Sequence, residues 1–415
     1  MNKKLLAVAV AGALAAPGVA FAQSSVTISG IFKASLENIR IGSPGVGRTG
    51  LNTSENRVAD DSSRILFNVV EDLGGGLQAI AQLDWRVQFD QGQSSVGGNN
   101  HVGLRSKTMG RIFFGRQDLH YFNRESNLTD LAGSLKADSI SLLAYMPGGT
   151  AIAAATRTPN VIHYTTPNWR GFTVLAAMST SPNPASATTG TAAAGTVGGA
   201  TGISANGSVT EGDIGTAARK GNAFNLNPNY EASNWQVGYS YWNSKPDGGT
   251  GFATTAAQTN ATADQRSDRL YGSFKIAGFK LGLAWDRSRI KTSTNVAAGA
   301  SPTGVALLSG TEIGNRTAWS LPLSYTMGNN QFHFHYTKAR DDRRTLVQDG
   351  AKMVALSYQY TLSKRTSVGL TYAKITNDPG ASYNLFTTTS LGSASAAVAP
   401  GEAPRIIAGT MRHAF

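Results

Sequence analysis

The chain contains no cysteine among its 415 residues, which excludes a disulfide framework, thiol nucleophiles and thiolate metal sites. Proline is scarce, with 14 residues, whereas glycine is abundant, with 47. This balance is typical of a β protein with many turns. Beyond the first 22 residues, no uncharged apolar run approaches the roughly 20 residues that a membrane-spanning helix needs. The sequence therefore indicates no transmembrane helix in that part of the chain.

Acidic residues are also few, because 25 Asp and Glu face 37 Lys and Arg, which gives a formal charge of +12. The basic residues are scattered through the chain rather than grouped in arms or helices, so the sequence does not indicate binding to nucleic acid. A diffuse positive field favours the approach and passage of anions.

The N-terminus reads as a secretory signal peptide. Lys3 and Lys4 precede an apolar stretch over residues 5–16, and a small-x-small site ends at Ala22. The alternative, a transmembrane helix, is disfavoured because the apolar stretch is too short. We expect cleavage before Gln23, which divides the chain into a signal peptide (1–22) and one mature domain (23–415).

Period-2 alternation dominates the rest of the chain. Leu83 and Trp85 fall on one face of a predicted strand, and Asp84 and Arg86 fall on the other. The small, polar and charged face can line water, and we do not expect it to build a dry core. Sixteen such stretches follow one another, separated alternately by tight turns and long segments. The predicted long segments are residues 39–61, 118–159, 179–221, 244–266, 291–314 and 377–404.

This pattern predicts an all-β fold, a 16-stranded antiparallel transmembrane β-barrel with short periplasmic turns and long external loops. The last strand ends on Phe415 and is expected to pair with the first strand, since closure removes the free sheet edges. Aromatic residues near strand ends suggest interfacial girdles, although ordinary β-propensity would also place aromatics in strands.

Several segments, in this order, resemble general bacterial porins of the beta-proteobacterial type over essentially the whole mature chain. They are Ser25-Val26-Thr27-Ile28-Ser29-Gly30, Ser63-Arg64-Ile65, Glu71-Asp72-Leu73-Gly74-Gly75-Gly76-Leu77, Phe114-Gly115-Arg116-Gln117, His163-Tyr164-Thr165-Thr166-Pro167-Asn168 with Gly171-Phe172, and Met411-Arg412-His413-Ala414-Phe415.

The resemblance implies an outer-membrane channel for passive diffusion of small hydrophilic solutes, and the basic charge adds a preference for anions. It implies a homotrimer, a third external loop that folds into the lumen, no cofactor and no enzymatic activity. The implied partners are outer-membrane lipids, lipopolysaccharide and the barrel-assembly machinery, for which Phe415 is the expected assembly signal.

The resemblance also implies a pore constriction with basic residues on the wall and acidic residues on the third loop and the wall. The basic candidates are Arg64, Arg86, Arg116 and Lys33. The acidic candidates are Asp84, Asp118, Glu125, Asp130 and Asp138. The chain departs from the enterobacterial pattern, because Thr165 stands where that pattern has another arginine and the loop lacks Pro-Glu-Phe-Gly-Gly. The alternative is that the arginines pair with lipid phosphates or turn carboxylates and that the acids are solvated surface residues.

Other functions are less well supported. His333 and His335 share a strand face, but no nearby ligand completes a metal site. The glycine spacing at residues 45–50 is expected in an external loop because no helix follows it. A solute-specific channel for a small anion such as phosphate or a carboxylate stays open. So does a surface adhesin or anchor that uses the 179–221 loop, whereas no nucleophile–base pair supports a hydrolase.

Overall fold

The computed structural model describes residues 25–43, 53–121, 134–147, 151–154, 157–180, 222–245, 263–292, 308–343, 347–385 and 398–415. The expected signal peptide and the glycine motif at 45–50 lie outside these residues. Among the described residues, no helix is long and apolar enough to span a membrane.

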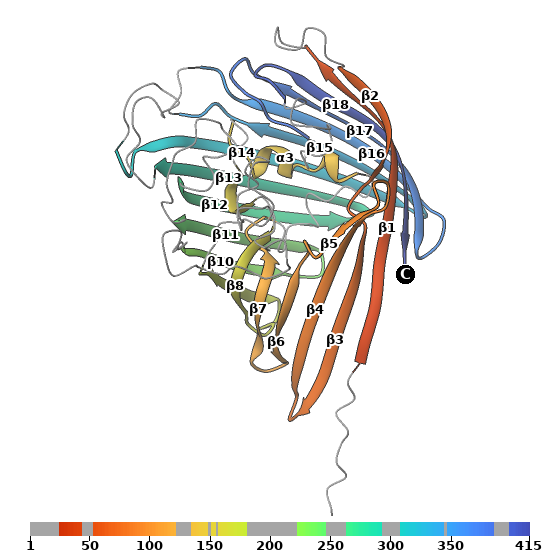
Figure 1. Ribbon diagram of the computed structural model, residues 1–415, viewed down its shortest axis with the longest axis vertical. Coiled ribbons are helices and arrows are strands. Elements are labelled where there is room, and N and C mark those ends of the chain that lie inside the picture. The colour runs from red at the N-terminus through yellow and green to blue at the C-terminus, as the bar shows by residue number, and fades with distance from the viewer. Residues whose placement is uncertain are drawn as a thin grey trace, which may run out of the picture.

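The described residues form eighteen strands in one sheet (Figure 1). The strands are β1 (Ser25–Gly42), β2 (Ser54–Asp60), β3 (Arg64–Gly74), β4 (Leu77–Gln88), β5 (Gln93–Ser95), β6 (Asn100–Ser106), β7 (Gly110–Asp118), β8 (Arg157–Thr165), β9 (Phe172–Ser179), β10 (Asn222–Glu231), β11 (Trp235–Lys245), β12 (Ala263–Ile276), β13 (Phe279–Thr292), β14 (Glu312–Met327), β15 (Asn330–Ala339), β16 (Ala351–Thr361), β17 (Thr366–Asn377) and β18 (Ala403–Ala414). The helices are short: η2 (Leu135–Ala137), α3 (Ile140–Leu143) and η3 (Ile152–Ala154).

Two pairs of these strands each act as one strand of the barrel. β3 pairs with the first half of β1, and β2 pairs with its second half. β5 and β6 pair in the same way with β4. The eighteen segments therefore make sixteen barrel strands, which agrees with the number expected from the alternation.

The sheet closes on itself through β1 and β18. Their antiparallel register runs from Ile31 opposite Ala414 to Gly42 opposite Ala403, and the C-terminus lies beside β1 (Figure 1). The barrel strands between them also pair antiparallel with their neighbours, so the sheet forms a closed ring. The predicted 16-stranded antiparallel β-barrel is confirmed.

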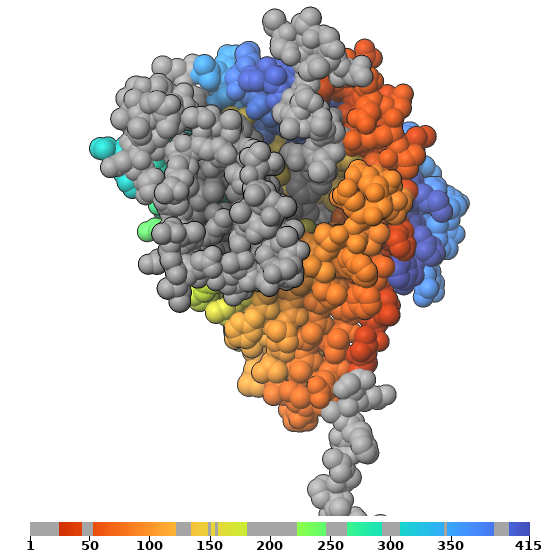
Figure 2. All heavy atoms as spheres, viewed as in Figure 1, coloured from red at the N-terminus to blue at the C-terminus, as the bar shows by residue number. Residues whose placement is uncertain are grey.

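The two faces of the barrel wall have the predicted polarity. Leu83 and Trp85 are each 39% exposed on the outer surface, whereas Asp84 between them is 1% exposed and Arg86 is half-buried. The same alternation places Leu270, Leu283, Leu356, Leu370, Ile407 and Met411 outward, each exposed by half or more. In Figure 2 the orange side chains of β3, β4 and β6 form a continuous outer surface at the lower end. The apolar residues therefore face the lipid and the polar ones face the interior.

The predicted loops overlap the ends of strands, and the overlap is largest for the loop expected over 39–61. Residues 39–42 and 54–60 of that range are strand, because β1 continues to Gly42 and β2 begins at Ser54. Alternation persists there with its inner face apolar, since Ile39 and Ile41 are buried and Arg40 is exposed. The loop expected over 118–159 contains η2, α3 and η3, and β8 begins before its predicted end.

Gly30 and Phe415 form a close contact at the barrel seam. The Phe415 amide and carbonyl exchange hydrogen bonds with Gly30, with N···O distances of 3.1 and 3.0 Å. The Phe415 ring covers Gly30 and stacks on Phe32, with ring centroids 5.6 Å apart. A Cβ at Gly30 would lie 2.5 Å from the Phe415 ring and 2.6 Å from the carbonyl oxygen of Arg64. The terminal aromatic therefore needs a glycine beneath it.

Replacing Gly30 by alanine is expected to destabilise the folded barrel by about 1–3 kcal/mol, because the added methyl group overpacks the seam. The folded fraction is measured by the heat-modifiable migration of unboiled outer-membrane samples on a gel. The matched control is Gly409→Ala in β18, where a Cβ meets nothing within 4 Å. Equal folded fractions for the two variants would contradict the proposed contact.

Candidate functional site

The described parts of the β7–β8 loop (residues 119–121, 134–147 and 151–154) lie in the interior of the barrel. In Figure 1 its helix α3 lies within the curve of the sheet, and contacts connect α3 with β14, β15 and β16. The described parts of the loop also contact inward-facing residues of β1, β11 and β12. The loop therefore spans between opposite walls.

A small buried core holds α3 against the wall. Ile140, Leu142 and Leu143 are buried, and they belong to one cluster with inward-facing alanines of β13–β17. These alanines are Ala284, Ala318, Ala339, Ala355 and Ala373, all fully buried. The expectation that the inner face builds no dry core is wrong here, because small side chains leave space that the leucines of the loop fill.

Arg316 of β14 anchors the C-terminal end of α3. Its guanidinium donates to the carbonyl oxygens of Leu142, Leu143 and Tyr145. It also forms a fully buried ion pair with Asp286 of β13, with an N···O distance of 2.8 Å. The arginine satisfies carbonyl groups that a helix end leaves without intrahelical partners, and Asp286 balances its charge.

A second anchor attaches the loop to β1 and to the bend between β2 and β3. The Lys136 ammonium lies 2.5 Å from a carboxylate oxygen of Glu37, and Arg57 pairs with the other oxygen of Glu37 at 3.1 Å. Lys33 pairs with Asp61 at 3.1 Å, and Asp61 also accepts from the backbone N–H of Leu135. All the charges in this buried group have partners.

The beginning of the loop is held by hydrogen bonds. The ring Nδ1 of His120 lies 2.9 Å from the hydroxyl of Ser240 on β11, and Tyr121 donates to Asp286. Burial lowers the pKa of His120 well below its ordinary value, and the positive charge of Arg269 lowers it further. His120 is therefore neutral at physiological pH and serves as a hydrogen-bonding residue.

The predicted basic wall residues divide into two groups. Arg64 and Arg86 lie directly opposite each other on β3 and β4, and Arg86 donates to Ser62 and Asp84 at 2.7 and 2.8 Å. The Nε atoms of Arg64 and Arg116 are buried and lack a hydrogen-bond partner among the described residues. Lys33 belongs instead to the anchor with Asp61 and does not join the arginines.

Sequence reasoning missed Arg157, which lies with the arginines. Arg157 begins β8 opposite Asp118, and its Nε is 3.8 Å from the Asp118 carboxylate. Its charge acts on both Arg86 and Arg116. The only sequence signal was its place at the end of the long third loop, close to a predicted strand.

The predicted acids also have different surroundings. Asp84 is buried and pairs with Arg86, whereas Asp118 accepts from Asn99 at 2.6 Å beside Arg157. Asp138 is 1% exposed, and its carboxylate accepts from the Ile140 backbone N–H at the start of α3. Glu125 and Asp130 lie outside the described residues.

Sequence reasoning also missed the residues that position the loop. Glu37 shares the inner face of β1 with Lys33, and this shared parity was the available signal. Its partner Lys136 lies 99 residues away in the chain. The pairing of Arg316 with loop carbonyls had no signal in the sequence, because any arginine on an inner face could have taken that role.

A closed barrel with an apolar exterior, a polar interior and an internal loop defines a channel-type protein of the bacterial outer membrane. The chain belongs to the Gram-negative porin family, whose model matches residues 7–380. This confirms the resemblance and the outer-membrane location inferred from the sequence.

Two relatives match part of the chain. Outer membrane porin protein 32 of Delftia acidovorans is 35% identical over 177 residues, covering 41% of this chain and 48% of that protein. An outer membrane porin protein of Bordetella pertussis is 26% identical over 186 residues, covering 41% of this chain and 46% of that protein. The chain thus spans about half the length of these relatives.

Solved structures share the fold over nearly the whole chain. The anion-selective porin from Comamonas acidovorans has a TM-score of 0.68 at 19% identity, covering 95% of this chain and 100% of that one. The trimer form of OmpT from Vibrio cholerae has a TM-score of 0.56 at 12% identity, covering 94% and 99%. At these identities the likeness establishes the architecture.

Replacing Arg316 by alanine is expected to release α3, since it leaves Asp286 as a buried charge without its cation, at a cost of about 3–5 kcal/mol. We expect a lower thermal unfolding midpoint and larger fluctuations of the single-channel current. Arg365→Ala, in the exposed β16–β17 turn, is the control. The anchor assignment fails if both measurements match those of wild type.

Proposed function

We propose that the protein is an anion-preferring channel for passive diffusion of small hydrophilic solutes, without a cofactor and without catalysis. The observation that carries the proposal is an imbalance of charge on the interior wall. Arg64, Arg86, Arg116 and Arg157 are close to only two described carboxylates, those of Asp84 and Asp118. The pore constriction is proposed to lie beside this arginine group.

The other described acids near the loop already have partners within the protein. Glu37 and Asp61 are neutralised by Lys136, Arg57 and Lys33, and Asp138 accepts from the backbone N–H of Ile140 at the start of α3. These acids therefore contribute little negative field to the passage, while the arginines keep an excess of positive charge. This arrangement lowers the barrier for anions relative to cations.

The expected selectivity is a preference rather than an exclusion. One charge at roughly 6 Å contributes on the order of 3 kcal/mol when the effective dielectric constant is near 20. Water in the passage and dissolved salt reduce this contribution, because the Debye length is about 8 Å at physiological ionic strength. The fold likeness to an anion-selective porin supports the same direction of preference.

The absence of catalysis is part of the proposal. The described residues contain no group of three side chains able to hold a metal ion. The family and the fold are those of channels. A dedicated site for a small anion remains the alternative, and a particular row of inward-facing residues favours it, as described below.

We also propose that the barrel assembles as a homotrimer after export and removal of residues 1–22. The trimer form of OmpT, which shares the fold, supports this proposal. The close contact of Phe415 with Gly30 and Phe32 at the seam supports recognition of the terminal aromatic by the barrel-assembly machinery. Closure of the barrel between β1 and β18 depends on Phe415 reaching Gly30 and Phe32.

Phosphorylated lipids are proposed to bind a basic belt on the outer surface near the long loops. The belt consists of Arg40, Arg405, Lys374, Lys352 and Lys338 on β1 and β15–β18. Three of its cross-strand pairs carry like charges: Arg40 with Arg405, Lys374 with Arg405, and Lys338 with Lys352.

Such pairs are destabilising by themselves. None of the five residues forms a salt bridge with another described residue, although Asp378 lies within electrostatic reach of Lys338 and Lys352. The phosphate groups of lipopolysaccharide would supply the missing negative charge.

Lipopolysaccharide is expected to raise the thermal unfolding midpoint of the wild-type barrel, and the rise should be at least halved in Lys374→Gln/Arg405→Gln. The control is Lys364→Gln/Arg365→Gln, which removes the same number of charges from the turn that joins β16 and β17 at the opposite end. Identical rises in both double variants would remove the belt as the lipid site.

Replacing Arg116 by glutamate is expected to lower the chloride-to-potassium permeability ratio about fivefold, equivalent to about 1 kcal/mol, because it reverses a charge in the arginine group. The ratio follows from the reversal potential of single channels in a salt gradient. Lys107→Glu, in the exposed β6–β7 turn, should change it much less. An unchanged reversal potential for Arg116→Glu would place Arg116 away from the constriction.

A further inference from the structure

One row of inward-facing side chains crosses five neighbouring strands at the end of the barrel that carries the short turns. The register sets Lys275 of β12 opposite Lys280 of β13, Lys280 opposite Ser324 of β14, Ser324 opposite His333 of β15, and His333 opposite Ser357 of β16. The row therefore brings two ammonium groups, an imidazole and hydroxyl groups to one height on the wall.

The alternation of the strands shows that this row faces inward. Phe279 and Leu281, which flank Lys280, are exposed on the outer surface by 45% and 47%. Ala284 shares the parity of Lys280 and is fully buried. The lysines therefore point to the water-filled side rather than toward lipid.

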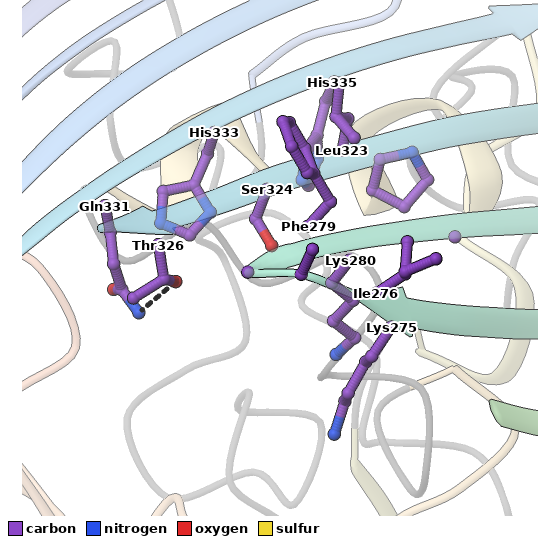
Figure 3. Close-up of a pocket in the computed structure, with 14 residues that line it drawn as sticks. Lys275, Ile276, Phe279, Lys280, Leu323, Ser324, Thr326, Gln331, His333 and His335 are labelled. Carbon is purple, nitrogen blue, oxygen red and sulfur yellow. Dashed lines mark hydrogen bonds between the residues drawn. The ribbon is translucent and has the colours of Figure 1, made fainter. Parts of the chain in front are cut away.

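A cavity of about 620 Å³ lies over the row. Its lining includes Lys275, Lys280, Ser324, His333 and His335, and none of the described residues that line it is acidic. In Figure 3 the two lysine side chains extend in the same direction from adjacent strands, with Ser324 and His333 on the next strands. The cavity thus presents several hydrogen-bond donors and concentrated positive charge.

Two further features fit an anionic ligand. Lys275 and Lys280 lie directly opposite each other, so an anion bound at this height would be attracted by two positive charges at once. The Nε2 atom of His333 is buried and lacks a hydrogen-bond partner among the described residues, and Lys280 acts electrostatically on this ring. Gly282, one step along the inner face from Lys280, also lines the cavity.

The cavity is also connected to the internal loop. His335 lines the cavity, and its Nδ1 lies 3.0 Å from the hydroxyl of Ser139, which precedes α3. The Ser139 hydroxyl accepts a hydrogen bond from Ser320 of β14 at 2.8 Å. A solute that passes the internal loop would meet the lysine row next.

We propose that Lys275, Lys280, Ser324 and His333 form a binding subsite for small dianions whose charge resides on oxygen atoms, such as dicarboxylates or phosphate. The two ammonium groups bind the anionic oxygens, and Ser324 and the His333 ring complete the hydrogen bonds. The inference rests on the proposed channel function and adds a solute class to it. The subsite holds dianions at the short-turn end, so their flux saturates at concentrations where chloride flux does not.

The experiment uses the full-length protein in planar bilayers, with succinate or inorganic phosphate as the probe and acetate as the monoanion. We expect the wild-type succinate current to saturate. The half-saturating concentration should rise about tenfold in Lys275→Gln/Lys280→Gln, because two attractive charges are lost. Lys275→Arg/Lys280→Arg should retain the wild-type value, and Lys107→Gln in the exposed β6–β7 turn should leave it unchanged.

A second readout does not involve transport. Phosphate should raise the thermal unfolding midpoint of the detergent-solubilised wild-type barrel more than that of the double glutamine variant. If the double variant does not assemble, Lys275→Gln replaces it, because Lys275 is exposed and its substitution does not disturb a buried group.

The outcomes separate the subsite from the channel function. If the reversal potential of the wild-type channel in a salt gradient shows no preference for anions, the proposed function is overturned. If that preference is intact, a succinate current that does not saturate in the wild type, or an equal half-saturating concentration in wild type and the double variant, overturns the subsite alone. If the double variant keeps its acetate and chloride conductance but its succinate current saturates only at higher concentration, the result supports the subsite.

Discussion

Every strand that crosses hydrocarbon must satisfy its backbone N–H and C=O groups on a neighbouring strand, because lipid offers no hydrogen-bond partner. In this chain that requirement is met by the register between β1 and β18, which closes the sheet. Closure gives each strand one face toward lipid and one toward the interior. The outward apolar residues, the inward polar residues and the space for an internal loop all follow from it.

The internal loop is positioned by two different forces. Its leucines fill space above the inward alanines of β13–β17, which buries apolar surface. Its charged and polar groups then meet fixed partners, with Lys136 on Glu37 and Arg316 on the carbonyl oxygens that follow α3. Apolar packing favours a position near the wall, and the ion pairs select one place along it, since a buried charge without its partner is costly.

The same anchors shape the electrostatics of the interior. Among the described residues, Glu37 and Asp61 pair with basic side chains, and Asp138 accepts from the backbone at the start of α3. The arginines on β3, β4, β7 and β8 lie beside two described carboxylates, those of Asp84 and Asp118. A modest positive net charge on the whole chain would not by itself predict this local imbalance. The lysine row on β12 and β13 extends positive charge toward the short-turn end.

The alternation at Leu83, Asp84, Trp85 and Arg86 was sufficient to predict which face meets lipid, because successive side chains of a strand point to opposite sides. The number of strands, the closure of the barrel, the short turns and the family could also be predicted from the sequence. The extension of β1 to Gly42 was missed because the polarity of its inner face changes there: Ile39 and Ile41 pack in the interior.

The barrel and its polarity could be predicted from the sequence, since both depend on a local period of two residues and on the lengths between strands. Which charges meet depends on the three-dimensional fold. Glu37 finds Lys136, Arg157 joins Arg86 and Arg116, and Lys275 faces Lys280, each through closure, loop folding or strand register. Electrostatic interactions depend on distance in space, and local periodicity does not specify which distant residues reach the same height on the wall.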